Sequence, residues 1–132
     1  MDSKYILGIA ELDSQHEKIE SSFVAFQEGI ENKDRRHNLP DIHGSLCEKL
    51  RFHFYAEESI MQIFAYPEFQ EHRKSHLEIL KSIEGCKVKN LTKADIEKLR
   101  DQPMQLFFEQ ILSQDMRFAK FIQRNKERMG IQ

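Results

Sequence analysis

The sequence predicts an all-α protein, an antiparallel up-down-up-down four-helix bundle that follows a short N-terminal arm. Apolar residues recur every three or four positions along four segments of the chain, which is the spacing of one buried helix face. The alternating pattern of a strand is not evident, and the connections between the segments are short enough to join antiparallel neighbours. The expected helices cover roughly residues 13–32, 40–65, 67–85 and 92–126.

The first half of the chain contains two of these helices. Residues 1–12 form the arm, and Asp13 is the expected N-cap because its side chain can accept hydrogen bonds from the first turn. The apolar stripe of the first helix consists of Ile19, Phe23, Phe26 and Ile30. A polar segment, residues 32–40, ends with Pro40 and is expected to be a loop. The apolar stripe of the second helix includes Leu46, Leu50, Met61 and Phe64.

Proline and a capping pair divide the second half of the chain. Tyr66-Pro67 should break the helix, because the residue before a proline avoids helical angles whereas proline suits a first helical turn. Thr92 and Asp95 have the spacing of a capping box that opens a helix. Pro103 lies inside the last helical pattern, and we therefore expect a break or kink near it. The apolar stripe of the last helix consists of Phe107, Ile111, Phe118 and Ile122.

Length and composition restrict the class of protein. A chain of 132 residues with 39% hydrophobic and 32% charged residues suits a single globular domain over residues 1–132. The net charge of −2 gives no basic patch and so no reason to expect nucleic-acid binding. No apolar run approaches membrane-spanning length, and the N-terminal residues lack the apolar region of a secretory signal. We therefore expect a cytoplasmic protein with no membrane insertion.

Six ionisable residues fall on or beside the apolar stripes of the four helices. They are His16, His53, Glu57, His72, His76 and Asp115. On a helix, residues four apart lie above one another. His53 and Glu57 form one such pair and His72 and His76 form another, so each pair can face a single site. A buried imidazole or carboxylate must be paired or bind a metal. The combination therefore favours metal binding over the alternative, a purely structural polar network.

Other polar residues near this set have a simpler interpretation. His37 lies in the polar loop and His43 at the start of the second helix, so both are expected to be solvated. Glu58 follows Glu57 by one residue, which turns it away from the buried face, and it is expected to be exposed. The two cysteines, Cys47 and Cys86, form no CxxC motif and are expected to remain thiols.

The motifs around the six residues have an informative order along the chain. They are Gly8-Ile9, Leu12-Asp13-Ser14-Gln15-His16, His53-Phe54-Tyr55-Ala56-Glu57-Glu58, Met61, Tyr66-Pro67, His72, His76, Ile111 and Asp115. In this combination, which spans nearly the whole domain, the chain closely resembles the bacterial hemerythrin family. The resemblance implies a four-helix bundle with a non-haem, carboxylate-bridged pair of iron ions that binds O2 reversibly.

The resemblance also implies a role for each matching residue. One iron would take His16 and His53, the other His72 and His76, and Glu57 and Asp115 would bridge the two. In the family a further histidine of the second iron comes five residues before the aspartate, where this chain has Gln110. Gln110, or a water held by it, could complete the site; alternatively the second metal is bound weakly, or it keeps an open position that favours oxidation or new reactivity.

The resemblance gives the expected function as well. Phe54, Met61, Phe107 and Ile111 match positions of the family's O2 pocket. The leading hypothesis is oxygen carriage, storage or sensing by a protein that is not an enzyme, with O2 as its ligand and no protein partner identified by the sequence. The alternatives are a di-iron redox enzyme, a protein that reacts with NO or peroxide, and iron storage, because the ligand set is altered at Gln110.

Overall fold

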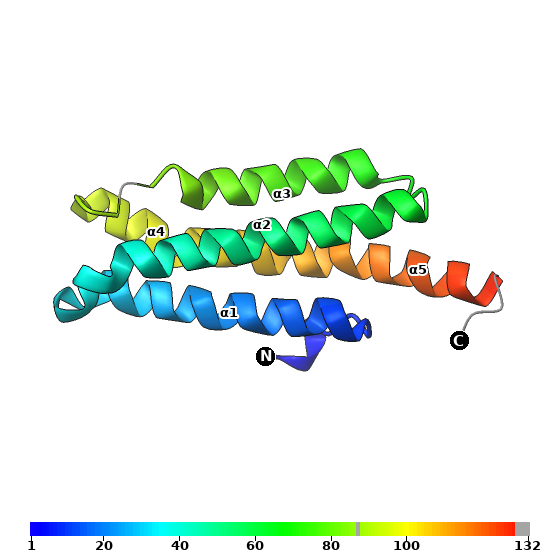
Figure 1. The fold of residues 1–132 in the computed structure, drawn as a ribbon, viewed down its shortest axis with the longest axis horizontal. Coiled ribbons are helices and arrows are strands. Elements are labelled where there is room, and N and C mark those ends of the chain that lie inside the picture. Colours follow the sequence, from blue (N-terminus) through cyan, green and yellow to red (C-terminus); the bar gives the residue numbers. More distant parts are fainter. Residues whose placement is uncertain (87, 129–132) are drawn as a thin grey trace.

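The computed structural model describes residues 1–86 and 88–128, and this part of the chain is helical with no strand. The first three long helices are α1 (Ala10–Glu31), α2 (Leu39–Ile63) and α3 (Phe69–Glu84). The fourth rod consists of α4 (Lys93–Gln110) and α5 (Met116–Arg128), which are joined by the π-helical segment η3 (Ile111–Asp115). Figure 1 shows that successive rods run in opposite directions. The predicted all-α four-helix bundle is confirmed.

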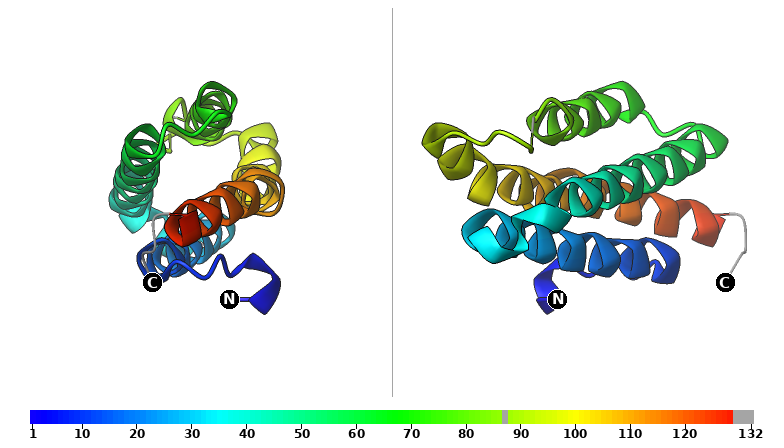
Figure 2. Two further views of the ribbon diagram at one scale, coloured as in Figure 1. Left: turned by 90° about the vertical axis from the view of Figure 1, so that its right-hand side faces the viewer. Right: turned by 60° about the vertical axis from the view of Figure 1, so that its left-hand side comes forward.

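The four rods surround a common core. α1 packs against α2 and α4, and α3 packs against the same two helices. The end-on view in Figure 2 shows this ring, with the N-terminal arm outside it beside α1. None of the helices in the described ranges is long and apolar enough to cross a membrane.

The first helix begins three residues earlier than the sequence predicts. α1 starts at Ala10, and Asp13 lies inside its first turn instead of capping it. The Asp13 carboxylate accepts hydrogen bonds from the backbone N–H groups of Leu7 and Gly8, at 2.8 and 3.0 Å. Gly8 has φ of 86°, a conformation that glycine adopts readily. Asp13 therefore fixes the turn between the arm and the helix, which lets the helix extend toward the N-terminus.

The connections on either side of α2 also differ in detail from the prediction. Residues Lys33–Asn38 form a 3₁₀ helix, η2, and Pro40 lies in the first turn of α2, where its missing N–H has no helical partner to lose. α2 ends two residues earlier than expected, and Ala65 takes a left-handed conformation with φ of 52°. Pro67 lies in the turn that follows, so that α3 begins at Phe69 instead of residue 67.

Of the break or kink expected near Pro103, the break is absent from the structure. Pro103 lies within α4, is buried, and the helix continues past it to Gln110. Packing against the bundle compensates for the one hydrogen bond that proline removes. The irregularity comes eight residues later, in the π-helical segment. The capping box at the start of α4 is present as predicted: Thr92 and Asp95 exchange side-chain to backbone hydrogen bonds of 3.0 and 3.1 Å.

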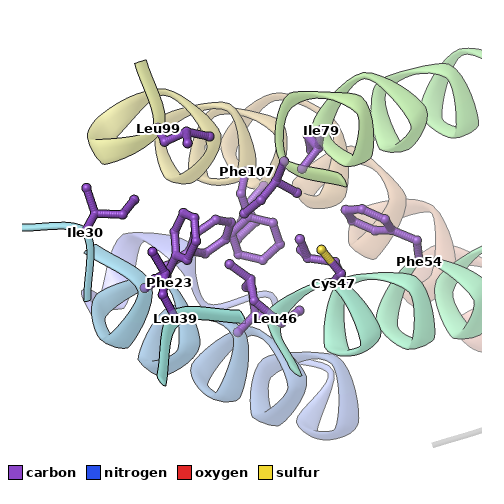
Figure 3. Close-up of a cluster of buried hydrophobic side chains, with 14 residues drawn as sticks. Phe23, Ile30, Leu39, Leu46, Cys47, Phe54, Ile79, Leu99 and Phe107 are labelled. Carbon is purple, nitrogen blue, oxygen red and sulfur yellow. The ribbon is translucent and has the colours of Figure 1, made fainter. Parts of the chain in front are cut away.

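Two apolar clusters fill the core, and Figure 3 shows the larger of them. The larger cluster includes Phe23, Leu46, Leu50, Phe54, Ile79, Phe107 and Ile111, and the smaller consists of Leu12, Met61, Tyr66, Phe118 and Ile122. On each rod, buried polar residues lie between members of the two clusters; His16, for example, lies between Leu12 and Ile19 in the sequence. The bundle therefore has a polar layer between two apolar ends.

Candidate metal centre

The polar layer brings together all six residues that the sequence singles out. His16 comes from α1, His53 and Glu57 from α2, His72 and His76 from α3, and Asp115 from η3. Each is at most 2% exposed. They form two groups whose candidate ligand atoms lie within 4.8 Å of one another. The first group is His16, His53, Glu57 and Asp115, and the second is Glu57, His72, His76 and Asp115.

The first group joins α1 and α2 to the fourth rod. The Nε2 atoms of His16 and His53 are 3.0 Å apart. His53 Nε2 lies 3.3 Å from Oε2 of Glu57, and His16 Nε2 lies 3.3 Å from Oδ2 of Asp115. Two ring nitrogens and two carboxylate oxygens therefore point at one small volume.

The second group joins α3 to the same two carboxylates. His72 Nε2 lies 2.6 Å from Oε1 of Glu57 and 2.7 Å from Oδ1 of Asp115. His76 Nε2 lies 3.4 Å from Oε1 of Glu57. Each carboxylate thus directs one oxygen at the first group and its other oxygen at the second. This is the arrangement that carboxylates need in order to bridge two metal ions.

The cluster contains donors that hydrogen bonds within the protein do not satisfy. Both oxygens of Glu57, Oδ2 of Asp115 and Nε2 of His76 are buried and have no hydrogen bond of good geometry in the described ranges. Buried polar atoms usually have a partner, and leaving one without costs about 1–3 kcal/mol. These atoms lie close together but do not have the geometry of hydrogen bonds with one another. Such an arrangement fits a bound cation between them.

The charge of the cluster supports the same interpretation. Burial would raise the pKa of the Glu57 carboxyl, but the neighbouring His53, His72 and His76 hold that pKa well below its usual range. Burial would lower the pKa of His72, but contacts with Asp115 and Glu57 outweigh it and raise that pKa to about 9. The buried Glu57 carboxylate therefore stays ionised and needs positive charge beside it, which a proton on His72 or a metal ion supplies.

Gln110 lies on the buried side of the fourth rod, just before the π-helical segment. It is 5% exposed, and neither Oε1 nor Nε2 of its amide has a hydrogen-bond partner in the part of the chain that the structure describes. The segment Ile111–Asp115 has the wider π turn, which brings residues five apart close to the same face of a helix. Gln110 and Asp115, five residues apart, thus both turn inward.

Two residues that support the histidines were missed by the sequence analysis. Gln15 Oε1 lies 2.6 Å from Nδ1 of His53, and Glu58 Oε2 lies 2.8 Å from Nδ1 of His76. The expectation that Glu58 is exposed is wrong, because it faces α3 and its side chain is only 22% exposed. Gln15 is next to His16 in the sequence, and Glu58 is next to Glu57. A hydrogen-bond acceptor next to a cluster residue, on the side that faces an adjacent helix, is the signal that could have identified both.

Apolar side chains cover the cluster. The Phe54 ring stacks on His76, with centroids 4.0 Å apart, and the edge-on Phe107 ring lies 5.5 Å from His16. Ile111 belongs to the same apolar cluster as these two rings. Met61 is fully buried but lies in the smaller apolar cluster. The structure therefore places three of the four expected O2-pocket residues in the larger apolar cluster and the fourth in the smaller one. The smaller cluster also contacts the site, because its Tyr66 and Phe118 rings lie 6.4 and 6.2 Å from the His72 ring.

The remaining histidines lie outside the cluster. His37 is exposed, and its Nδ1 lies 3.1 Å from the carbonyl oxygen of Asp34. His43 was expected to be solvated, but it is half-buried, with Nε2 at 2.8 Å from the carbonyl oxygen of Ile83 on α3. Neither residue is in a group that could hold a metal.

Comparison with known proteins agrees with this geometry. The family model described as the hemerythrin HHE cation binding domain matches residues 7–123, which contain all six residues of the cluster. No curated protein and no solved structure matches the chain.

Proposed function

Because this chain belongs to the hemerythrin HHE cation-binding domain family, we propose that its polar layer holds two iron ions and binds O2. His16 and His53 would hold one ion, His72 and His76 the other. Glu57 and Asp115 would bridge the pair, since each has one oxygen facing each group. This division of carboxylate oxygens between two histidine pairs is the observation that carries the proposal.

The donor set fits iron, copper or zinc better than calcium or magnesium, and membership of the hemerythrin family favours iron among these. Imidazole nitrogen suits iron, copper and zinc, whereas calcium and magnesium prefer a shell of oxygens. Two bridging carboxylates with terminal imidazoles favour a pair of ions of intermediate hardness. Two ferrous ions, if these residues held them, would supply the electrons that reversible binding of O2 needs. Six protein residues shared between two ions would leave room at the centre for O2.

Gln110 is the proposed further donor on the second metal. Its amide oxygen is neutral and harder than an imidazole nitrogen, and it is buried without a partner. Either this oxygen or a water that it holds would complete the second metal. This residue supports the second metal less strongly than a histidine would.

The apolar side chains around the cluster limit the reactions that can take place there. Phe54 and Phe107 are buried and pack on histidines at the two ends of the cluster. Such walls would limit the water and protons that reach the centre, which would slow irreversible oxidation of the iron. Reversible binding, as in oxygen carriage, storage or sensing, is therefore our proposal in preference to catalytic turnover.

The experiment is a metal count followed by a spectrum. Protein purified without oxygen should contain close to two irons per chain, and O2 should produce a visible absorption band that disappears under argon. His37→Ala should behave like wild type, whereas Glu57→Ala and Asp115→Ala should lose metal. Equal metal losses in all three variants would contradict the ligand assignment, and irreversible bleaching with O2 would contradict reversible binding.

A second candidate function rests on Gln110. A second iron with a weak or missing donor has an open position, and such a site can reduce O2, peroxide or NO. Turnover of peroxide or NO well above that of free iron, together with bleaching in O2, would favour a redox enzyme. Iron storage is a third alternative, and it requires many more ions per chain than the two groups can hold.

A further inference from the structure

A small hollow on the surface of the bundle reaches one of the buried histidines. It has a volume of about 10 Å³ and lies between the turn that leads into α3 and the start of α5. Its walls are formed by Tyr66, Glu68, Glu71, His72, Gln114 and Arg117. His72 belongs to the candidate metal centre, so this hollow reaches the edge of the centre.

The side chain of His72 differs from those of its neighbours at the hollow. Its Nε2 faces Glu57 and Asp115, but its Nδ1 has no hydrogen-bond partner in the described ranges and is not fully cut off from solvent. The same atoms of His53 and His76 are held by other side chains, at 2.6 and 2.8 Å. His72 is 2% exposed, so the ring that lines the hollow is nearly buried.

The chemistry of the walls suits a cation. Glu68 and Glu71 contribute carboxylates. Gln114 donates from Nε2 to Ser75 Oγ at 2.7 Å, while its Oε1 is buried and has no hydrogen-bond partner among the described residues. Carboxylate and amide oxygens together with an imidazole are ligands for a divalent ion.

An exposed ion pair forms part of the wall of the hollow. Arg117 Nη1 lies 3.1 Å from Glu68 Oε1, and Tyr66 donates a hydrogen bond of 2.9 Å from its hydroxyl to Glu68 Oε2. The side chains of Arg117 and Glu68 are 56% and 40% exposed, so the pair contributes little to stability and opens readily. In its closed form the hollow has room for about one water, which is too little for a hydrated metal ion.

We propose that this hollow, opened by movement of Arg117, is the port through which divalent metal ions enter and leave the buried centre. The ion takes the place of the Arg117 guanidinium on Glu68, is shared with Glu71, and passes His72 to reach Glu57. The ion passes from the outer carboxylates of Glu68 and Glu71 to the inner carboxylate of Glu57. It therefore has a negatively charged partner at each end of the route. This inference rests on the proposed metal centre.

The test compares two matched arginine variants. Arg117→Ala opens the port, and Arg35→Ala is the control. Arg35, in η2 at the opposite end of the bundle, forms an exposed ion pair with Glu28, also at 3.1 Å. Protein is loaded with Zn²⁺ and mixed with excess colorimetric chelator, and release is followed in time. Uptake of Zn²⁺ by metal-free protein is measured separately.

We expect Arg117→Ala to speed both release and uptake of Zn²⁺ about fivefold. This factor corresponds to the free energy that an exposed ion pair contributes, converted into a ratio of rates. The affinity for Zn²⁺ and the melting temperature should remain those of wild type. If Arg117→Ala acted only through the loss of a positive charge, uptake of Zn²⁺ would be faster and its release slower. Acceleration of both rates is therefore the result that a port predicts. Arg35→Ala should leave both rates unchanged.

A second pair of variants tests the port without opening it. Glu71→Gln should slow uptake of Zn²⁺, whereas Glu78→Gln, an exposed change on the same helix, should not. Two bound Zn²⁺ ions with wild-type rates in Arg117→Ala and Glu71→Gln would overturn the port and leave the metal centre intact. A wild-type protein that takes up no metal would overturn the metal centre, and the port with it.

Discussion

Nδ1 of His76 lies 2.8 Å from Oε2 of Glu58, so a carboxylate supports a histidine of the second group. The corresponding atom of His53 in the first group faces the neutral amide oxygen of Gln15. A carboxylate behind an imidazole fixes the orientation of the ring and increases its basicity more than an amide does. The second group, which has Gln110 as its proposed further donor, thus has the stronger support for one of its histidines.

Replacing Glu58 by glutamine should therefore weaken the second metal. We expect the affinity of that metal to fall by about tenfold, the lower end of the range for a lost outer partner, with little change at the first metal. Competitive titration of Zn²⁺ against a chelator resolves the two affinities. Glu48→Gln, an exposed change on the same helix, is the control, and an equal effect of both variants would show that Glu58 acts only through surface charge.

Histidine at position 110 should strengthen the second metal. Gln110 is buried, and neither atom of its amide has a partner within residues 1–86 and 88–128, so a donor at this position already turns toward the interior. An imidazole nitrogen is a better donor to iron than an amide oxygen. In Gln110→His we expect tighter binding of the second ion and a more intense, more persistent visible band with O2.

The neighbouring residue provides the control for this change. Glu109 is exposed and accepts a hydrogen bond from Gln105, so Glu109→His adds a histidine that faces away from the core. It should change neither metal affinity nor spectrum. If Gln110→His also leaves the metal stoichiometry and the spectrum unchanged, position 110 does not reach the second metal.

Periodicity predicts the fold and the six clustered residues, because buried helix faces are repeated patterns in the sequence. His16 and His72 could be placed on apolar stripes without knowledge of their neighbours. The start of α1 could not be predicted in this way, since Asp13 has the chemistry of an N-cap but hydrogen-bonds with the arm instead. Pro103 is a similar case, because packing outweighs the local preference of a single residue.

The hydrogen-bond partners of Nδ1 of His53 and of His76 depend on how neighbouring helices pack. Glu58 is next to Glu57 in sequence and points away from the apolar stripe, which made exposure the natural expectation. Whether such a side chain faces solvent or an adjacent helix depends on the angle and distance between α2 and α3. That information is not local, and it also determines that Gln15 meets His53 across 38 positions of the chain.

Two glycines should respond in opposite ways to alanine. Gly44 is an exposed residue of α2 with open space around it, so Gly44→Ala should stabilise the protein by about 1 kcal/mol through helix propensity. At Gly29 in α1 an added Cβ would lie 2.9 Å from Cδ1 of the fully buried Leu39, and this overpacking should cost about 1 kcal/mol net. Urea denaturation of both variants measures the difference, and equal stabilisation by both would show that Leu39 can move aside freely.

Removal of bound metal should destabilise the whole bundle, because the cluster connects all four rods. Without a cation, the oxygens of Glu57 and Nε2 of His76 remain buried without good partners. A ligand that binds only the folded state at about 100 times its dissociation constant adds about 2.7 kcal/mol to the free energy of unfolding. Urea denaturation with and without Zn²⁺ should show a gain of at least this size, which Glu57→Ala loses and His37→Ala keeps. Equal stability of the metal-free and Zn²⁺-treated wild type would mean that the polar layer is held together by its own charges, with protons in place of metal.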